Sequence, residues 1–417
     1  MKKSSVTLVA CLCSATAVFA QEEMELSPVE KLEQKAQTLE SAVQKLQKFK
    51  VSGYVQTQYQ YGERDASLKV GSANENPEES FSRIGIRRGR IKFVYEEGIV
   101  SATFQPDITE KGVAFKDAFL AVKDPWLGTS VLKAGVFDRP FGDEISFSSS
   151  RRESPERSTI FQTLFPEERD LGASLTLQAA KTSPWNILKL EAGLFSGNGI
   201  KQETDSRLDF IGHLSVAKAI GSDMKIGGGV SYYNGGVYQG TEKVYSIAGK
   251  EFVLDDNADN KGQFAKREYV GVDAQFSIMS ALGMTQLRGE YLFGEQPAAK
   301  GNSKSPNASA LPAIDTYKRN FSGGYAVFVQ DIGMLPVSAV LKYDWYNPNT
   351  KVSGNEDVTE GDVAVNTFGF GLLWRASPNL KLTAYYEINK NETTDEIAKF
   401  KEDRKDNLFT LRLQYKF

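Results

Sequence analysis

The sequence predicts an all-β protein, a sixteen-stranded antiparallel transmembrane β-barrel with a short N-terminal coiled-coil helix. Three observations predict this fold. About sixteen segments alternate apolar and polar residues with a period of two, as strands do when one face meets lipid and the other meets water. The connections between these segments are long and short in turn. Past the first twenty residues, no apolar run reaches the roughly 18 residues of a membrane helix, which excludes a helical membrane protein.

The N-terminus has the features of a secretory signal peptide. Two lysines precede an apolar stretch that ends at Val18, and Ala20 supplies a small residue for cleavage. The sequence therefore predicts a signal peptide over residues 1–20 and a mature chain that begins at Gln21. A lipobox-like pattern before Cys11 is the alternative, but the apolar stretch before it is short and continues past it, which favours the signal peptide.

The residue counts exclude most catalytic and metal chemistry. Cys11 and Cys13, the only cysteines, lie in the signal peptide, and His213 is the only histidine. Zinc sites and thiol nucleophiles need more such side chains, so we expect no enzymatic activity, no cofactor and no metal site. The mature chain keeps 48 of the 50 basic residues beside 53 acidic ones, a net charge of about minus five. That balance argues against a nucleic-acid partner.

The first part of the mature chain, residues 21–49, is predicted to contain one helix. Ser27 and Glu30 form an S-x-x-E capping box, and Pro28 suits the first helical position. A narrow apolar stripe with heptad spacing favours a coiled coil over a single amphipathic helix lying on a neighbouring surface. Its seam consists of Val29, Leu32, Ala36, Leu39, Val43 and Leu46.

The remainder, residues 50–417, is predicted to form the barrel. Each strand has about the length, roughly ten residues, that a tilted strand needs to cross a bilayer. We place the strands near 51–61, 82–95, 98–107, 114–124, 130–139, 170–180, 185–196, 208–219, 224–235, 267–278, 284–294, 319–331, 336–347, 364–375, 380–390 and 406–417.

Loop lengths indicate which membrane the barrel spans. Long loops such as 62–81 and 236–266 alternate with short turns such as 332–335, and this sorting is the pattern of bacterial outer-membrane barrels. A soluble sandwich has no reason to sort its loops by length. Since an even number of strands returns both ends to one side, we expect the coiled coil in the periplasm. It would join protomers or contact the cell wall there.

The alternation also assigns a lipid face and a lumen face to each strand. In the closing strand, Leu411, Leu413 and Tyr415 are assigned to lipid and Arg412 to the lumen. The strand 82–95 presents a basic column on its lumen face, for which pairing with nearby carboxylates is the structural alternative. The third loop, about 140–169, contains arginines and phenylalanines, which favours packing inside the lumen, where the arginines would concentrate anions.

Several short motifs, taken in order, resemble the phosphate-selective porins O and P of bacterial outer membranes. The resemblance covers nearly the whole barrel and implies a sixteen-stranded homotrimeric porin with its constriction on the third loop. The motifs are Arg87-Arg88, Phe115-Lys116-Asp117-Ala118-Phe119, Ala134-Gly135-Val136-Phe137, Pro140-Phe141-Gly142, Phe165-Pro166, Arg169-Asp170-Leu171-Gly172 and Leu411-Arg412-Leu413-Gln414-Tyr415-Lys416-Phe417.

The resemblance also implies roles for single residues. Arg87 and Arg88 match the family's arginine pair at the pore mouth, and Asp117 matches its acidic residue near the central site. Strict alternation turns only one of the two arginines inward unless a β-bulge re-aims the other. Asp138 and Arg139 stand near the place of the family's constriction lysine, so that lysine has no clear match.

Together these features predict a bacterial outer-membrane channel for passive diffusion of small anions, with phosphate or polyphosphate as the solutes that the resemblance implies. A general non-selective or weakly cation-preferring porin is one alternative, and a surface adhesin or structural barrel with a plugged lumen is another. Outer-membrane lipid, small anions and two further copies in a homotrimer are the expected partners. The candidate anion pathway consists of Arg87, Arg88, Arg90, Lys92, Asp117, Lys133, Arg139, Arg151, Arg152, Arg157, Arg169 and Arg412.

Overall fold

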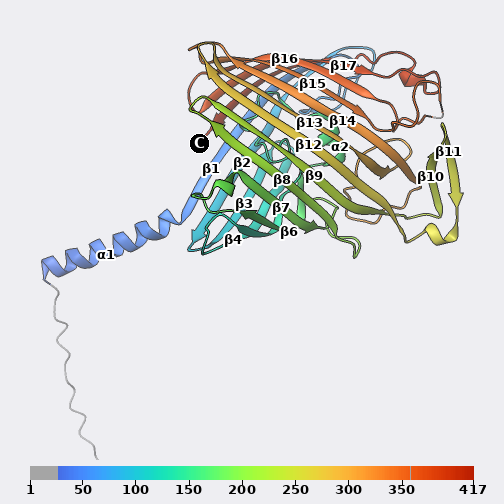
Figure 1. The fold of residues 1–417 in the computed structure, drawn as a ribbon. Coiled ribbons are helices and arrows are strands. Elements are labelled where there is room, and N and C mark those ends of the chain that lie inside the picture. The colour runs from blue at the N-terminus through green and yellow to red at the C-terminus, as the bar shows by residue number, and fades with distance from the viewer. Residues whose placement is uncertain (1–26, 357) are drawn as a thin grey trace, which may run out of the picture. The chain divides into compact units, whose positions relative to one another are not determined.

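The computed structural model describes residues 27–356 and 358–417 (Figure 1). The predicted signal peptide lies outside the described residues. The chain divides into two units, with the boundary between Gln47 and Lys48. In the part of the chain that the structure describes, no helix is both long and apolar enough to cross a membrane.

Helix α1 (Pro28–Gln47) is the predicted N-terminal helix. Its capping box is present, because the Ser27 amide donates to Glu30 Oε2 (2.7 Å) and the Glu30 amide donates to Ser27 Oγ (3.2 Å). The seam side chains are exposed along the helix in this single chain, for example Leu32 and Leu39. The coiled coil therefore stays a prediction.

Sixteen antiparallel strands close into a barrel, which confirms the predicted fold class. Each strand pairs with the next barrel strand along the chain, and β1 closes on β18 from Tyr54 opposite Lys416 to Gly62 opposite Leu408. The strands are β1 (Phe49–Gly62), β2 (Phe81–Glu97), β3 (Val100–Thr109), β4 (Gly112–Lys123), β5 (Val131–Asp138), β6 (Arg169–Gln178), β7 (Leu188–Phe195), β8 (Asp209–Ile220), β9 (Met224–Tyr238), β12 (Phe264–Ser280), β13 (Gly283–Ala298), β14 (Thr316–Asp331), β15 (Val337–Asn347), β16 (Val365–Arg375), β17 (Leu380–Asn391) and β18 (Leu408–Lys416).

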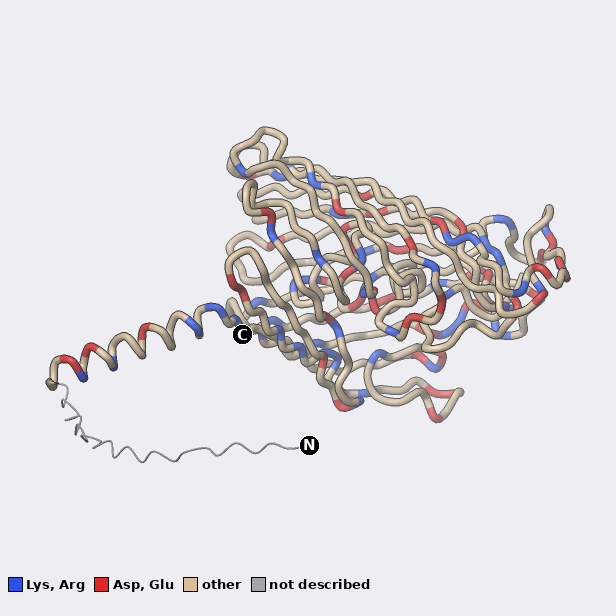
Figure 2. The backbone as a smooth tube through the Cα atoms, turned by 90° about the horizontal axis from the view of Figure 1, so that it is seen from below, with Lys and Arg blue, Asp and Glu red and all other residues tan. Residues whose placement is uncertain are grey.

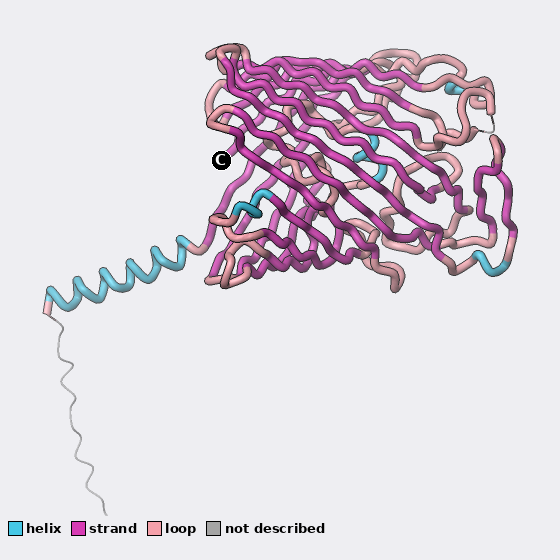
Figure 3. Tube along the Cα trace, viewed as in Figure 1, coloured by secondary structure: helices cyan, strands magenta, loops and turns pink. Residues whose placement is uncertain are grey.

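The connections add elements that the sequence analysis missed (Figure 3). A hairpin of β10 (Lys243–Ala248) and β11 (Glu251–Asp256) stands in the long loop between β9 and β12. The third loop, between β5 and β6, contains helix α2 (Thr159–Leu164). Short 3-10 helices cover Pro184–Ile187, Ala258–Asn260 and Ala398–Phe400.

The two ends of the barrel differ in their connections, as the sequence predicts. One end, which we call the turn rim, carries both barrel termini and short turns such as that between β8 and β9. The other end, the loop rim, carries the long loops. The exception is the β3–β4 connection, predicted as a loop near 108–113, which is a tight turn at Glu110 and Lys111.

The lipid-facing and inward-facing residues follow the predicted alternation. On β18, Leu413 is 46% exposed and Arg412 is 4% exposed. The same division holds on β15, where Leu341 and Tyr343 are exposed and Lys342 is buried. An apolar exterior of this extent is stable only in lipid.

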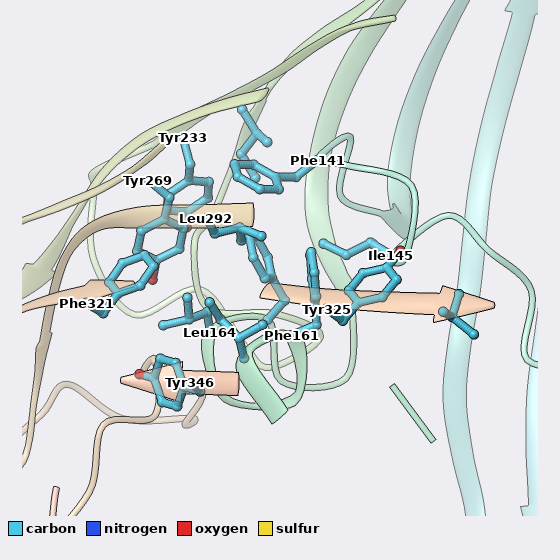
Figure 4. Packing of buried hydrophobic residues seen from close by; sticks show 14 of the residues in the cluster. Phe141, Ile145, Phe161, Leu164, Tyr233, Tyr269, Leu292, Phe321, Tyr325 and Tyr346 are labelled. Atoms are coloured by element: carbon cyan, nitrogen blue, oxygen red, sulfur yellow. The ribbon is translucent and has the colours of Figure 1, made fainter. Parts of the chain in front are cut away.

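An apolar cluster fills part of the barrel interior (Figure 4). Phe161 and Phe165 of the third loop stack on each other with ring centroids 5.7 Å apart. Phe161 also meets Tyr325 edge-on at 6.2 Å, and Phe165 meets Tyr269 at 5.6 Å. The rings of these inward-facing tyrosines on β14 and β12 form an apolar surface against which the loop packs. The third loop therefore lies against the inner wall of the barrel.

Candidate functional site

A β-bulge in β2 turns two neighbouring arginines toward one carboxylate. The β1–β2 register shifts at this point, with Gln56 opposite Arg88 and Thr57 opposite Ile86, so that Arg87 is the extra residue. Arg87 Nε donates to Glu156 Oε1 (2.8 Å), and Arg88 Nη2 donates to Glu156 Oε2 (2.8 Å). The bulge thus removes the conflict between strict alternation and an inward arginine pair.

Arg412 on the closing strand completes this group, and we call Arg87, Arg88 and Arg412 the arginine cluster. Arg412 Nη2 donates to Glu156 Oε1 (2.7 Å), and its Nη1 donates to the Pro155 carbonyl (2.6 Å). Residues from the second and last strands therefore meet at one residue of the third loop. All three guanidinium groups are paired with the same carboxylate.

The charge state of Glu156 follows from these neighbours. Burial by itself would raise the pKa of its carboxyl group. The guanidinium groups of Arg87, Arg88 and Arg412 outweigh that effect and hold the pKa well below its ordinary value. Glu156 is therefore ionised throughout the physiological pH range, and it remains a permanent anion in the middle of the cluster.

A second ion-pair network surrounds Arg169 at the start of β6. Arg169 Nε donates to Asp117 Oδ1 (2.8 Å), while Nη1 contacts Asp138 (3.0 Å) and Glu168 (2.8 Å). Arg157 also pairs with Glu168. Burial would raise the pKa of Glu168, but the nearby cations, Arg157 first, keep that pKa well below its usual range.

Lys116 is a basic residue of this region that the sequence analysis did not select. The β3–β4 register shifts so that Gln105 faces Asp117 and Pro106 faces Phe115, which leaves Lys116 as the extra residue. The ammonium group acts electrostatically on Glu168. Pro106 was the feature of the sequence that could have indicated this β-bulge. Proline has no backbone N–H to donate to the neighbouring strand, so within a sheet it often marks a bulge.

Several predicted pathway residues are held in ion pairs or hydrogen bonds within the protein. Arg139 pairs with Asp170 (3.0 Å), and both side chains are buried. Arg157 donates to the Glu144 carbonyl (2.9 Å), and Arg90 pairs with Asp107 (3.0 Å). For Arg90, a member of the basic column on the strand 82–95, the molecule shows the structural alternative of pairing with a nearby carboxylate. Lys133 lies over the ring of Phe137, 5.8 Å from its centroid.

Basic residues, Arg90 among them, line two openings at the turn rim. One opening, about 310 Å³, is lined by Arg90, Lys92 and Lys416 among others. The second, about 500 Å³, is lined by Arg151, Lys381 and also Lys416. Among the described residues, Lys92, Arg151 and Lys416 form no ion pair. Their charges are therefore available to solutes, in contrast to those of the arginine cluster. Figure 2 shows the wider distribution, with both signs interspersed along the barrel.

Arg152 has an unusual environment on the third loop. It is 5% exposed, and none of its three guanidinium nitrogens has a hydrogen-bond partner among the described residues. Burial, together with the nearby charges of Arg157 and Arg88, lowers the pKa of Arg152 to about 9. A buried donor group without acceptors is energetically costly.

Gly142 lets the third loop turn from β5 into the lumen. Its φ of +61° lies in the left-handed region, and its amide donates to Ser231 Oγ (2.9 Å). A Cβ at this position would meet Glu290 Oε2. We expect Gly142→Ala to cost about 1–3 kcal/mol from backbone strain, with a further cost from the contact. The midpoint of urea unfolding in lipid vesicles measures this loss. Gly301→Ala, where a Cβ meets nothing, is the control.

The comparisons with known proteins identify the fold. No family model matches the sequence, and no curated protein matches it. Among solved structures, OprB of Pseudomonas putida has a TM-score of 0.54 at 8% identity and covers 90% of this chain and 96% of its own. OmpF of Salmonella typhi, in complex with daunomycin, has a TM-score of 0.54 at 10% identity, with coverage of 88% and 97%. The chain has a porin fold.

A third similar structure is the anion-selective porin from Comamonas acidovorans, with a TM-score of 0.52 at 11% identity. The match covers 88% of this chain and 99% of that one. At these identities the likeness defines the architecture alone. The porin fold and the apolar exterior together make this a β-barrel of the bacterial outer membrane.

Proposed function

We propose that this protein is an outer-membrane channel through which small anions diffuse passively. The observation that carries the proposal is the basic lining of the two turn-rim openings by Lys92, Arg151, Lys381 and Lys416. Low-dielectric walls focus the field of such charges and raise the local concentration of anions. Several weak sites in series favour conduction over retention. No step in this process is enzymatic.

Phosphate and polyphosphate are the solutes that we propose in particular. Guanidinium forks match the oxygens of phosphate, and the lumen brings several of them to the third loop. The sequence resemblance to phosphate-selective porins supports the same choice. The printed description of the Comamonas acidovorans protein as anion-selective adds support for anions in general.

We propose a homotrimer held in part by the α1 seam. In the described part of the chain, the seam residues of this 20-residue helix, such as Leu32 and Leu46, are exposed. Packing three such seams together would bury them. Light scattering of the detergent-extracted protein measures the number of subunits, and deleting residues 28–47 should lower the stability of the trimer to heat.

A second candidate, a structural barrel with a plugged lumen, is favoured by one observation. The third loop packs an apolar cluster against the wall and pairs its carboxylates with lumen arginines. Both features reduce the open cross-section. This candidate predicts no conductance.

A planar-bilayer recording under a KCl gradient separates the candidates. We expect discrete channels with an anion-signed reversal potential. The double variant Lys92→Gln, Lys416→Gln removes two unpaired charges at the openings and should move the reversal potential toward zero. Lys181→Gln, an exposed turn lysine on the same rim outside both openings, is the matched control. A cation-signed potential would eliminate the anion proposal, and absence of current would leave the plugged barrel.

A further inference from the structure

Glu156 occupies the position that an anion would take in the arginine cluster. Four hydrogen bonds of 2.7–2.9 Å reach its two carboxylate oxygens, two of them from Arg87 in a fork. The three guanidinium groups thus surround a planar oxyanion that is part of the protein itself. A free oxyanion that approaches them has to replace this carboxylate.

We propose that Glu156 is a tethered competitor that sets the specificity of the channel, so that oxyanions with two or more charges displace it and monovalent anions do not. This inference rests on the proposed function and names its substrate class. A tethered group acts at an effective concentration on the order of millimolar or more. A competing ion therefore needs intrinsically stronger binding, and a phosphate dianion has twice the charge of a carboxylate and more acceptor oxygens.

Arg152 gives the displaced carboxylate a place to go. It lies four residues before Glu156 on the third loop, and its charge is attracted electrostatically by the carboxylates of Glu144 and Glu156, with Glu144 the stronger of the two. Its guanidinium group has no hydrogen-bond partner while Glu156 is held by the cluster. Movement of Glu156 onto Arg152 would satisfy this buried cation and free the three arginines at the same time. The loop therefore has two discrete charge pairings available.

The surroundings of the cluster suit a multivalent ligand. Arg87 is the most accessible member, with a side chain 26% exposed. Lys69, on the β1–β2 loop, acts electrostatically on both Glu156 and Arg87, and its ammonium group has no ion-pair partner among the described residues. An oxyanion with several charges can contact the cluster and Lys69 together, whereas chloride offers one charge and no fork geometry.

Block of chloride current by inorganic phosphate tests this inference. The full-length channel is held in a planar bilayer in KCl, and the phosphate concentration that halves the current is measured. We expect Glu156→Gln to lower that concentration about tenfold, because the amide no longer competes as an anion. Glu153→Gln is the matched control, since Glu153 lies on the same loop and pairs with Arg288 outside the cluster. Glu153→Gln should change the half-blocking phosphate concentration less than about twofold.

Two further variants keep the test decisive. Glu156→Asp retains the charge on a shorter side chain and should lower the half-blocking concentration about threefold even if the glutamine variant fails to assemble. Arg152→Gln should raise the half-blocking phosphate concentration about threefold when Glu156 is present and should not change it in the Glu156→Gln background. If Glu156→Asp leaves phosphate block unchanged while the reversal potential stays anionic, the competitor role is wrong and the anion channel stands. A cation-signed potential removes the proposed function as well.

Discussion

Replacing Phe161 with alanine is expected to release the third loop from the barrel wall and raise single-channel conductance. Phe161 is 0% exposed and lies between Phe165 and Tyr325. Removal of a buried phenylalanine ring costs about 3–5 kcal/mol, partly through the cavity that it leaves. The barrel strands keep their ladder hydrogen bonds, so the loss falls on the loop.

Two measurements check this result. Conductance in a planar bilayer should rise severalfold, and a protease added to folded protein in vesicles should cut the third loop faster. Phe147→Ala is the control on the same loop. Phe147 does not belong to the apolar cluster, and its ring contacts Arg151 and Arg288 instead. If Phe161→Ala lowered the unfolding midpoint of the whole barrel without changing conductance, the loop would not be the constricting element.

Replacing Arg169 with alanine should have the largest effect on charge selectivity. Arg169 is the shared cation of Asp117, Asp138 and Glu168, with contacts of 2.8–3.0 Å. Without it, the buried Asp117 and the partly exposed Asp138 and Glu168 lose their common partner, and breaking a buried pair such as Arg169–Asp117 costs about 3–5 kcal/mol. The remaining negative charge beside the opening at Lys92 should move the reversal potential toward cations.

The comparison with Arg169→Lys separates charge from geometry. Lysine keeps the positive charge but loses the fork that reaches three carboxylates, so selectivity should be mostly retained while stability falls. Arg64→Ala is the control, because Arg64 is half exposed and its ion pairs with Asp65 and Glu78 are 3.7 and 3.8 Å long. An unchanged reversal potential in Arg169→Ala would show that solutes do not pass this network.

The strands and their faces could be predicted from the sequence because lipid and water impose opposite demands on alternate residues. Each predicted segment overlaps one observed barrel strand, and Arg412 and Leu413 face the sides that the alternation gives them. The hairpin β10–β11 could not be predicted in this way. It stands in a loop outside the membrane, where no lipid face imposes an alternation of apolar and polar residues. Helix α2 has six residues, too few for a helical period to appear.

The pairing partners of the basic residues could not be predicted. Glu156 lies in a loop without periodicity, and its partners Arg87 and Arg412 are distant in the sequence. Alternation gives the direction of a side chain but not what stands opposite it across the lumen. For the bulge at Lys116 the one local signal was Pro106, because a single inserted residue shifts the register without changing the composition of the strand.

The closure of β1 on β18 makes the arginine cluster a late product of assembly. Arg412 reaches Glu156 only from the last strand, and Gln58 on the first strand holds its guanidinium group through Nε (2.9 Å). Before closure these residues stand on two open sheet edges, and Glu156 lacks one of its three cations. An unfinished barrel therefore has neither a sealed wall nor the complete charge site. Closure of the barrel wall and completion of the arginine cluster are therefore one event, because both depend on β18 lying against β1.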